Sequence, residues 1–163
     1  MYYKIIDKFW RLIALLRIIL HNVVSCGRIK ISPTVMFRKN FYISVGGGGK
    51  ITIGKRVFFN RGCAVISHDS ITIGDRTIFG DGVKIYDHNH CYKDLKKPIG
   101  EQGFTKASIK IGSDCWIASN VVILKGVTIG DHAVIGAGCI IYKDVPANTL
   151  VVNKQELVMK PIK

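Results

Sequence analysis

Acidic residues are scarce in this chain of 163 residues, which carries 11 Asp and Glu against 24 Lys and Arg. The resulting formal net charge of +13 favours anionic partners, such as a phosphate-bearing cofactor, an acidic membrane surface or nucleic acid. No zinc-finger spacing, recognition-helix pattern or basic–aromatic RNA-binding signature accompanies this charge. We therefore expect no nucleic-acid partner.

Paired cysteines are also lacking. The five cysteines form no C-x-x-C pair, which argues against zinc ribbons and redox dithiols, and their odd number argues against a disulfide framework. Cys63, Cys115 and Cys139 fall on the small positions of a repeat described below, so we interpret them as core residues in a reducing compartment. A cytoplasmic location is the corresponding expectation.

A long uncharged apolar run is missing as well. Residues 1–24 are apolar over a wide face, but Arg11 and Arg17 interrupt them, which argues against a membrane-spanning helix and against an export signal. Polar side chains recur every three to four residues from Lys4 to His21, which predicts an amphipathic helix. Two interpretations stay open: the helix lies on the inner membrane surface with its basic stripe toward anionic headgroups, or it packs on protein.

The chain is rich in one pattern, a period of six residues. The stretch from Ile111 to Ile141 reads IGSDCW, IASNVV, ILKGVT, IGDHAV and IGAGCI, with an isoleucine opening each block. Six residues fit neither the helical period of 3.6 nor the strand period of 2. They fit the hexapeptide repeat of a parallel β-helix, in which one bulky side chain per side fills a triangular coil.

Extended backwards, the period predicts five coils of three sides over residues 29–146. One bulky side chain from each side should point inward, namely Ile31, Phe37, Ile43, Ile53, Phe59, Val65, Ile73, Phe79, Ile85, Ile111, Ile117, Ile123, Ile129, Ile135 and Ile141. Pro146 lacks a backbone donor and should end the β-helix, so residues 147–163 should leave the coil as a tail that folds over a neighbour.

Some coils are longer than 18 residues, and their extra residues all fall between the third side of one coil and the first side of the next. Residues 46–49, the segment at His68 and a loop over residues 91–110 should therefore stack at one corner. A loop of this length in a strict solenoid is a candidate functional element.

The loop is flanked by residues 87–90, the densest cluster of titratable groups. Imidazole moves protons near neutral pH, and His90 should present its ring to solvent at the corner where the loop departs. His68, His88 and His90 together would suggest a metal site. However, we expect His88 and His90 to point to different sides of the chain, which leaves one ligand missing, so no metal is expected.

Four stretches carry a family likeness: D-H-N-H-C-Y, E-Q-G-F, I-G-S-D-C-W-I-A-S-N-V-V-I-L-K-G-V-T-I-G-D and V-I-G-A-G-C-I-I-Y-K-D-V-P-A-N-T, at residues 87–92, 101–104, 111–131 and 134–149. They resemble the hexapeptide-repeat acyltransferases, in particular the galactoside and maltose O-acetyltransferases and the capsule and exopolysaccharide O-acetyltransferases. The resemblance implies an all-β solenoid, a left-handed parallel β-helix preceded by the amphipathic helix. It also implies acetyl-CoA as co-substrate and a homotrimer with each active site between two subunits.

By position, the resemblance makes His90 the general base that removes a proton from an acceptor hydroxyl, which then attacks the thioester directly. Glu101 would support the site, and Asp87 and His88 would contact the acceptor. Four residues would bind the cofactor: Trp116 near the pantetheine arm, Ser119 with its backbone N–H on the oxyanion, Ala137 at the pantetheine amides and Lys143 at the nucleotide phosphates.

Two departures from the family pattern fall at the adenine end of the implied cofactor site. Tyr142 stands where the family usually has Thr, and residues 152–158 replace its G-x-P-A-K-x-I signature.

The implied function is O-acetylation of a sugar hydroxyl with acetyl-CoA, in surface polysaccharide biosynthesis. A serine or xenobiotic acetyltransferase is the near alternative. A metal-dependent hydratase resembling the gamma carbonic anhydrases and a non-catalytic scaffold stay open.

Overall fold

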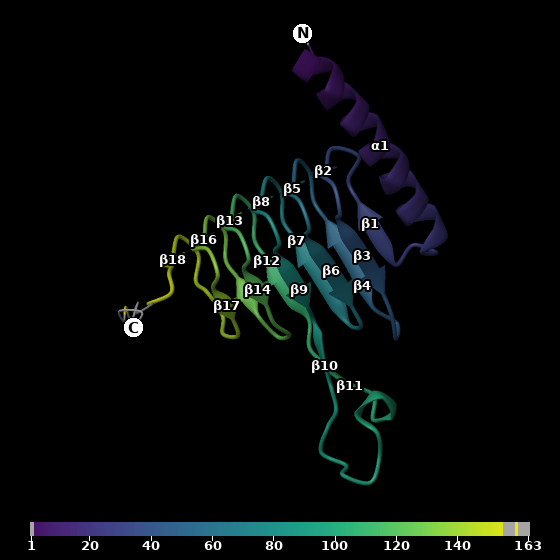
Figure 1. The fold of residues 1–163 in the computed structure, drawn as a ribbon, viewed down its shortest axis with the longest axis vertical. Coiled ribbons are helices and arrows are strands. Elements are labelled where there is room, and N and C mark those ends of the chain that lie inside the picture. The colour runs from purple at the N-terminus through teal and green to yellow at the C-terminus, as the bar shows by residue number, and fades with distance from the viewer. Residues whose placement is uncertain (1, 155–158, 160–163) are drawn as a thin grey trace, which may run out of the picture.

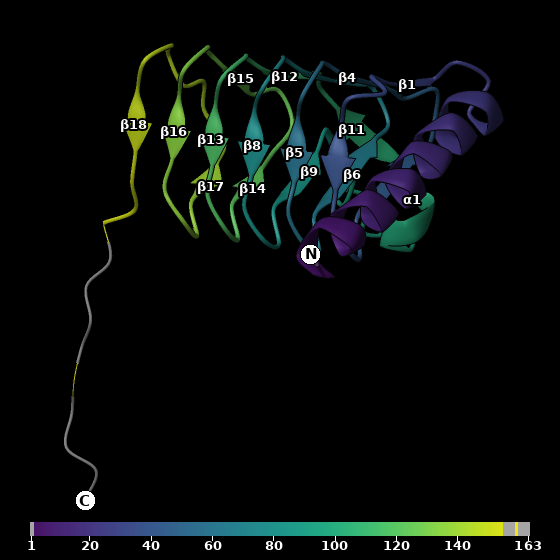
Figure 2. The same ribbon diagram turned by 90° about the horizontal axis from the view of Figure 1, so that it is seen from above.

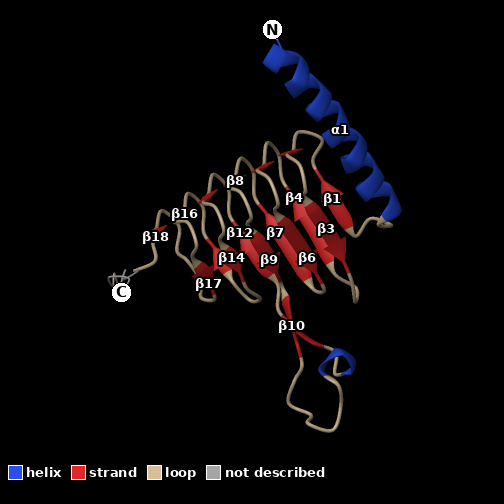
Figure 3. Cartoon of the chain, viewed as in Figure 1, coloured by secondary structure: helices blue, strands red, loops and turns tan. Residues whose placement is uncertain are grey.

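A computed structural model describes residues 2–154 and residue 159, most of which form a prism of three parallel sheets (Figures 1 and 2). Sheet A contains β1 (Ile29–Ile31), β4 (Lys50–Ile53), β7 (Ser70–Ile73), β12 (Ile109–Ile111) and β15 (Thr128–Ile129). Sheet B contains β2 (Met36–Phe37), β5 (Phe58–Phe59), β8 (Ile78–Phe79), β13 (Trp116–Ile117), β16 (Val134–Ile135) and β18 (Leu150–Val151). Sheet C contains β3 (Tyr42–Val45), β6 (Ala64–Ser67), β9 (Lys84–Tyr86), β14 (Val122–Ile123) and β17 (Ile140–Ile141). The chain visits the three sheets in turn, so the predicted solenoid is confirmed (Figure 3).

The interior of the prism is filled as the six-residue period predicts. Every residue predicted to point inward is buried, and the most exposed of them, Ile43, is 7% exposed. Along the axis, the Phe59 and Phe79 rings stack with centroids 4.5 Å apart, and the Phe41 ring lies tilted on Phe59 with centroids 4.7 Å apart. Full burial of one such side chain contributes roughly 1.5–3 kcal/mol, so this column of apolar residues is the main source of stability. Cys63, Cys115 and Cys139 are each 1% exposed, which confirms them as core residues.

Close approach between successive coils explains the glycine that so often follows the inward isoleucine. A Cβ built on Gly74 would lie 2.6 Å from the carbonyl carbon of Gly112 in the next coil. The chain then turns through a residue of positive φ, Arg76 at 60° and Asp114 at 56° in two successive coils. The Arg76 guanidinium donates to both carboxylate oxygens of Asp114, which ties these two exposed turns together.

The coil continues beyond the predicted end at Pro146. Val145 forms a parallel bridge with Ile129, and β18 pairs with β16 in register, so five complete coils are followed by part of a sixth. In the preceding coil, the residue equivalent to Pro146 is Gly130, whose N–H donates to the Val145 carbonyl of the next coil. Pro146 belongs to the last coil of the described part, where no later coil needs such a donor, so its missing N–H is tolerated. The predicted tail over residues 147–163 is thus wrong for 147–151, and residues 155–158 and 160–163 lie outside the described part.

The N-terminal helix α1 (Tyr2–Val24) lies against the first coil, where it contacts β1 and β2 (Figure 2). Ala14 and Ile18 are buried in this contact. The Arg17 guanidinium donates to the Phe41 carbonyl at 2.8 Å and lies 4.9 Å from the Phe37 ring centroid. The helix therefore covers the end of the apolar column, which would otherwise face water.

The opposite face of α1 is apolar and exposed. It carries Leu12, Leu15, Leu16, Ile19, Leu20, Val23 and Val24, of which Leu16 is 59% exposed. Of the two interpretations of residues 1–24, packing on protein is the one seen for the polar stripe at Arg17, because that guanidinium binds the first coil. Over the described residues, no helix combines the length and hydropathy needed to cross a bilayer.

The predicted stacking of the extra segments at one corner is confirmed. All of them connect sheet C to sheet A, and the Gly46 N–H donates to the Ser67 carbonyl at 2.8 Å. At the third coil the chain leaves the prism as β10 (His88–His90), turns through the 3₁₀ helix η1 (Ile99–Glu101) and returns as β11 (Phe104–Lys106). The two strands pair antiparallel, and the loop projects from the prism (Figure 1).

Asp87, the residue before the loop, fixes this corner. Its side chain is 0% exposed and accepts hydrogen bonds from the Ser67 hydroxyl (2.5 Å), the backbone N–H groups of His68 (2.7 Å) and Asp69 (2.9 Å), and approaches His88 Nδ1 (3.2 Å). Burial raises the pKa of Asp87, but these hydrogen bonds outweigh it and hold the pKa below its ordinary value. The carboxylate thereby joins the start of the loop to the coil below.

We predict that Asp87→Asn lowers the free energy of unfolding by about 2 kcal/mol, because an amide N–H₂ would then face backbone donors in a buried site. Asp131→Asn is the matched control, since Asp131 is exposed and accepts the Ser113 N–H through one oxygen, which an amide oxygen can replace. Urea unfolding at one protein concentration measures both variants. An equal change in the two would contradict this role of Asp87.

Candidate active site

His90 is one of the residues that line a hollow at the loop. The hollow has a volume of about 570 Å³, and its lining includes His90, Tyr92, Glu101 and Lys125. The His90 side chain is exposed, with its ring centroid 4.5 Å from that of Phe104 on the returning strand. The structure thus brings the two predicted catalytic residues, His90 and Glu101, to one concave surface.

The loop keeps its shape through Gln102, a residue that sequence analysis did not single out. Its side-chain oxygen accepts the Asp94 N–H at 3.0 Å, and its nitrogen donates to the carbonyls of Asp94 and Lys97, each at 2.8 Å. Lys125 was also missed, although its position next to a corner glycine one coil beyond the loop was a usable signal. Both residues line the hollow with His90.

Three histidines gather around Phe104. The rings of His68, His88 and His90 lie 4.4, 5.2 and 4.5 Å from its centroid, and His68 stacks on His88 at 3.9 Å. The expectation that His88 and His90 point to different sides is wrong, because residues i and i+2 of strand β10 share one face. Within residues 2–154 and 159, no group of three or more His, Cys, Asp or Glu side chains is arranged to hold a metal ion.

His68 is the inner member of this group. Its Nδ1 is buried and has no hydrogen-bond partner within the described part of the chain. Burial, assisted by the neighbouring His88 and Lys106, lowers the pKa of His68, while Asp87 opposes the shift. The ring therefore stays neutral and acts as a packing surface beneath β10.

The two residues predicted to contact the acceptor lie deeper than His90. The His88 side chain is 14% exposed, with Nδ1 beside the Asp87 carboxylate. No acceptor oxygen could reach Asp87 without displacing the donors that already surround it.

The predicted cofactor residues lie on two different edges of the prism. Lys143 follows β17 and shares the edge between sheets C and A with His90, where it stands one coil beyond Lys125. Ser119 and Ala137 lie on the edge between sheets B and C.

Trp116 points outward from the middle of sheet B and is 52% exposed. Because His90 and Ser119 lie on different edges of the prism, a single chain does not bring them together.

Comparison with known proteins gives matches over most of the chain. Residues 108–143 match the family described as bacterial transferase hexapeptide (six repeats). A Staphylococcus aureus (strain MRSA252) protein named "Putative acetyltransferase SAR2635" is 42% identical over 116 residues, which cover 71% of this chain and 57% of that protein. The chain thus spans little more than half the length of this curated relative.

Two solved structures share the fold. A hexapeptide-repeat acetyltransferase from Vibrio cholerae, crystallised with acetyl coenzyme A, is 30% identical with a TM-score of 0.59, over 72% of this chain and 64% of that one. A maltose O-acetyltransferase from Clostridium difficile is 30% identical with a TM-score of 0.63, over 87% of this chain and 74% of that one. With the repeat, the loop and its histidine in place on this fold, the chain belongs to the hexapeptide-repeat acyltransferase family.

Proposed function

We propose that this protein is an acetyl-CoA-dependent O-acetyltransferase that acts on a sugar hydroxyl, in surface polysaccharide biosynthesis. The observation that carries the proposal is the exposed imidazole of His90, which shares a hollow of about 570 Å³ with Glu101 and Lys125. Among the structural neighbours, one is named a maltose O-acetyltransferase and another was crystallised with acetyl coenzyme A, which supports the acyl donor and the class of acceptor.

The chain offers a suitable place for this co-substrate. Lys125 and Lys143 occupy equivalent positions of adjacent coils on the edge that carries His90. Acetyl-CoA bound along this edge would place its phosphates next to these cations. Acetyl-CoA, when bound, supplies an acyl carbon activated as a thioester. Glu101, on the wall of the same hollow, would orient the acceptor.

In the proposed reaction, His90 accepts the proton of the acceptor hydroxyl as that oxygen forms its bond to the acyl carbon. A backbone N–H at Ser119 donates to the developing oxyanion. The protonated His90 then gives its proton to the departing sulfur, which restores the neutral imidazole. Asp87 is a positioning residue, since it fixes the strand that carries His90 and has no free oxygen for the acceptor.

Replacing His90 by Ala is expected to lower kcat about 10²–10⁴-fold, because the transfer loses its general base. The melting temperature should change little, since the side chain is exposed. The measurement is thiol release from acetyl-CoA with a panel of sugars and lipid-linked glycans. His132→Ala, which removes an exposed histidine at a distant corner, is the control. A His90→Ala enzyme with kcat within a few-fold of the original would refute the assignment.

We further propose a homotrimer, in which His90 of one copy faces Ser119 of the next. Support comes from the outward side of sheet B, where paired residues form an apolar row along the whole prism: Met36, Phe58, Ile78, Trp116, Val134 and Leu150. The equivalent row on sheet A is polar and consists of Lys30, Thr52, Thr72, Lys110 and Thr128. An apolar sheet face of this length is typical of a surface covered by another subunit.

Ile78→Lys should convert the trimer to monomers and abolish acetyl transfer, because it places a charge in the middle of the apolar row. Thr72→Lys, an outward position in the same coil but on sheet A, should leave both assembly and activity intact. Light scattering coupled to size-exclusion chromatography gives the mass in each case. An Ile78→Lys protein that stays trimeric would exclude sheet B as the contact.

We also propose that the exposed apolar face of α1 lies on the surface of the inner membrane, on its cytoplasmic side. Seven apolar side chains share this face, and the exposed cations Arg28 and Lys30 follow the helix directly. An apolar helix face next to cations matches the interface of an anionic bilayer. This arrangement would hold the protein close to lipid-linked acceptors.

The combined change Leu16→Asp and Leu20→Asp should reduce the fraction of protein that sediments with phosphatidylglycerol vesicles at least tenfold. Leu95→Asp is the matched control, because Leu95 is a 97% exposed leucine on the loop. The double variant should keep its oligomeric mass. A changed mass with unchanged vesicle binding would show that α1 contacts a subunit instead.

A further inference from the structure

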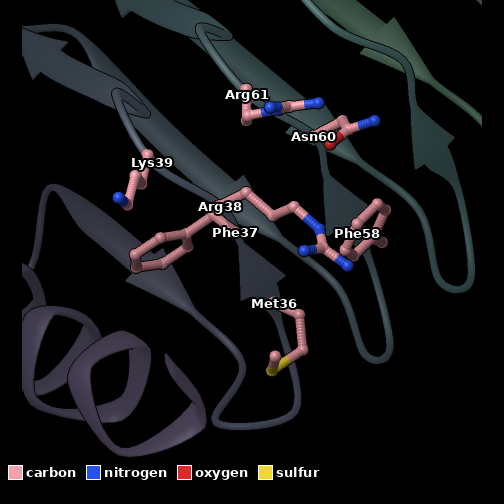
Figure 4. A pocket seen from close by; sticks show the side chains of 7 residues that line it. All are labelled: Met36, Phe37, Arg38, Lys39, Phe58, Asn60 and Arg61. Atoms are coloured by element: carbon pink, nitrogen blue, oxygen red, sulfur yellow. The ribbon is translucent and has the colours of Figure 1, made fainter. Parts of the chain in front are cut away.

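A second hollow lies on the edge between sheets B and C, in the first two coils (Figure 4). Its volume is about 610 Å³, and it is lined by Met36, Phe37, Arg38, Lys39, Phe58, Asn60 and Arg61. Three of these residues are cations and none is acidic. Because the hollow lies on a different edge from the loop, it is separate from the surface that carries His90.

Apolar side chains form the floor of this hollow and guanidinium groups its rim. Met36 and Phe58 are paired across β2 and β5 and both point outward, half-buried. The Arg38 side chain reaches across the hollow, with its guanidinium carbon 5.8 Å from the Phe58 ring centroid (Figure 4). An aromatic face next to a guanidinium suits a ligand that has both a ring and a negative charge.

The second guanidinium is held at its base. The Arg61 backbone N–H donates to Asp81 Oδ1 at 2.9 Å, and the side-chain Nε of Arg61 lies 3.6 Å from the same oxygen. Both side chains are exposed, at 71% and 47%, so the ion pair is weak and leaves the guanidinium accessible to another anion. Among the described residues, Arg38 and Arg61 bring two guanidinium groups to the hollow, and Asp81 is the carboxylate beside Arg61, which favours an anionic ligand.

The hollow is continuous with the edge that carries two of the predicted cofactor residues. Backbone hydrogen bonds run up this edge from coil to coil: Gly62 to Lys39, Gly82 to Arg61, Asn120 to Asp81 and Gly138 to Ser119. Arg61 and Ser119 are therefore two coils apart, or ~10 Å at the spacing of neighbouring strands. A group on a sugar whose hydroxyl lies near the Ser119 N–H could reach Arg61 over this distance.

We propose that this hollow binds an anionic group, a phosphate or a carboxylate, carried by the sugar acceptor. The proposal rests on the proposed acetyltransferase function and narrows its substrate class to negatively charged saccharides. Guanidinium groups bind both anions through paired N–H donors, and the Phe58 ring packs against the apolar face of the sugar. Met36 and Phe58 also belong to the apolar row of sheet B, so in the proposed trimer the hollow lies at the margin of the subunit contact, where it and the His90 loop of the next copy form the acceptor site together.

The test compares the wild-type trimer with Arg38→Gln and Arg61→Gln, using acetyl-CoA and three acceptors: glucose, glucose 1-phosphate and glucuronic acid. Of the two anionic sugars, we consider the one that the wild-type enzyme acetylates. In either variant, KM for this sugar should rise at least tenfold, kcat should stay within twofold, and KM for acetyl-CoA should stay unchanged. The anion that shows the effect identifies phosphate or carboxylate as the recognised group. Lys55→Gln, which removes an exposed cation from another corner of the second coil, should change nothing.

Lys143→Gln provides the reciprocal control, because it should raise KM for acetyl-CoA and leave KM for the anionic sugar unchanged. If Arg38→Gln raises KM for acetyl-CoA instead, the hollow belongs to the co-substrate and the proposal is wrong. A preference of the wild-type enzyme for glucose over both anions would also overturn it. Circular dichroism melting of each variant separates loss of binding from loss of folding.

Calorimetric titration with glucose 1-phosphate and glucuronic acid, without acetyl-CoA, distinguishes this proposal from the proposed function. Binding that weakens with salt and is lost in Arg38→Gln, together with no acetyl transfer to any acceptor, would keep the anion site and refute the acetyltransferase. Transfer to neutral sugars with no binding of either anion would refute the anion site and keep the acetyltransferase.

Discussion

The stacking of one coil directly on the next, at the spacing of neighbouring strands, is the constraint on which the rest of this structure depends. Because each coil must place a bulky side chain inward on all three sides, the chain cannot lengthen along a side without breaking the apolar column. Extra residues are therefore accommodated only where the chain changes direction. In this protein they all use the edge between sheets C and A, and the longest of them begins with β10, which carries His90. The position of His90 is thus a consequence of how the core is packed.

Much of this fold could be predicted because the six-residue period is a direct record of that packing. The inward residues, the small core cysteines and the shared corner all follow from counting. The last turn was missed because Val145 and Val151 lack the flanking glycines of earlier coils. It was also missed because Pro146 was expected to interrupt the hydrogen bonds between coils, whereas a proline in the last coil interrupts none. The outward face of α1 could not be predicted from its apolar pattern, since Arg17, a residue of its polar stripe, binds the first coil.

The sequence identified which residues belong to the candidate site, but it did not predict how they are arranged in space. Residue type and position at the loop corner selected His90, the family resemblance added Glu101, and both line one hollow. The burial of Asp87 depends on donors from the preceding coil, which no local pattern reveals. Similarly, the separation of His90 from Ser119 becomes visible only when the three sheets are traced around the prism. That separation is the reason why the proposed chemistry needs more than one copy of the chain.

The antiparallel pairing of β10 with β11 has a consequence for how this scaffold can change. The pair brings the start and the end of the loop to adjacent strand positions, with His88 opposite Lys106. The loop is therefore attached to the prism at the same two positions, whatever its length or sequence. The entropic cost of closing such a segment grows only slowly with its length. Residues beyond the strand pair can therefore be exchanged, shortened or extended while His90 keeps its place, so that, under the proposed function, one scaffold can serve acceptors of different size.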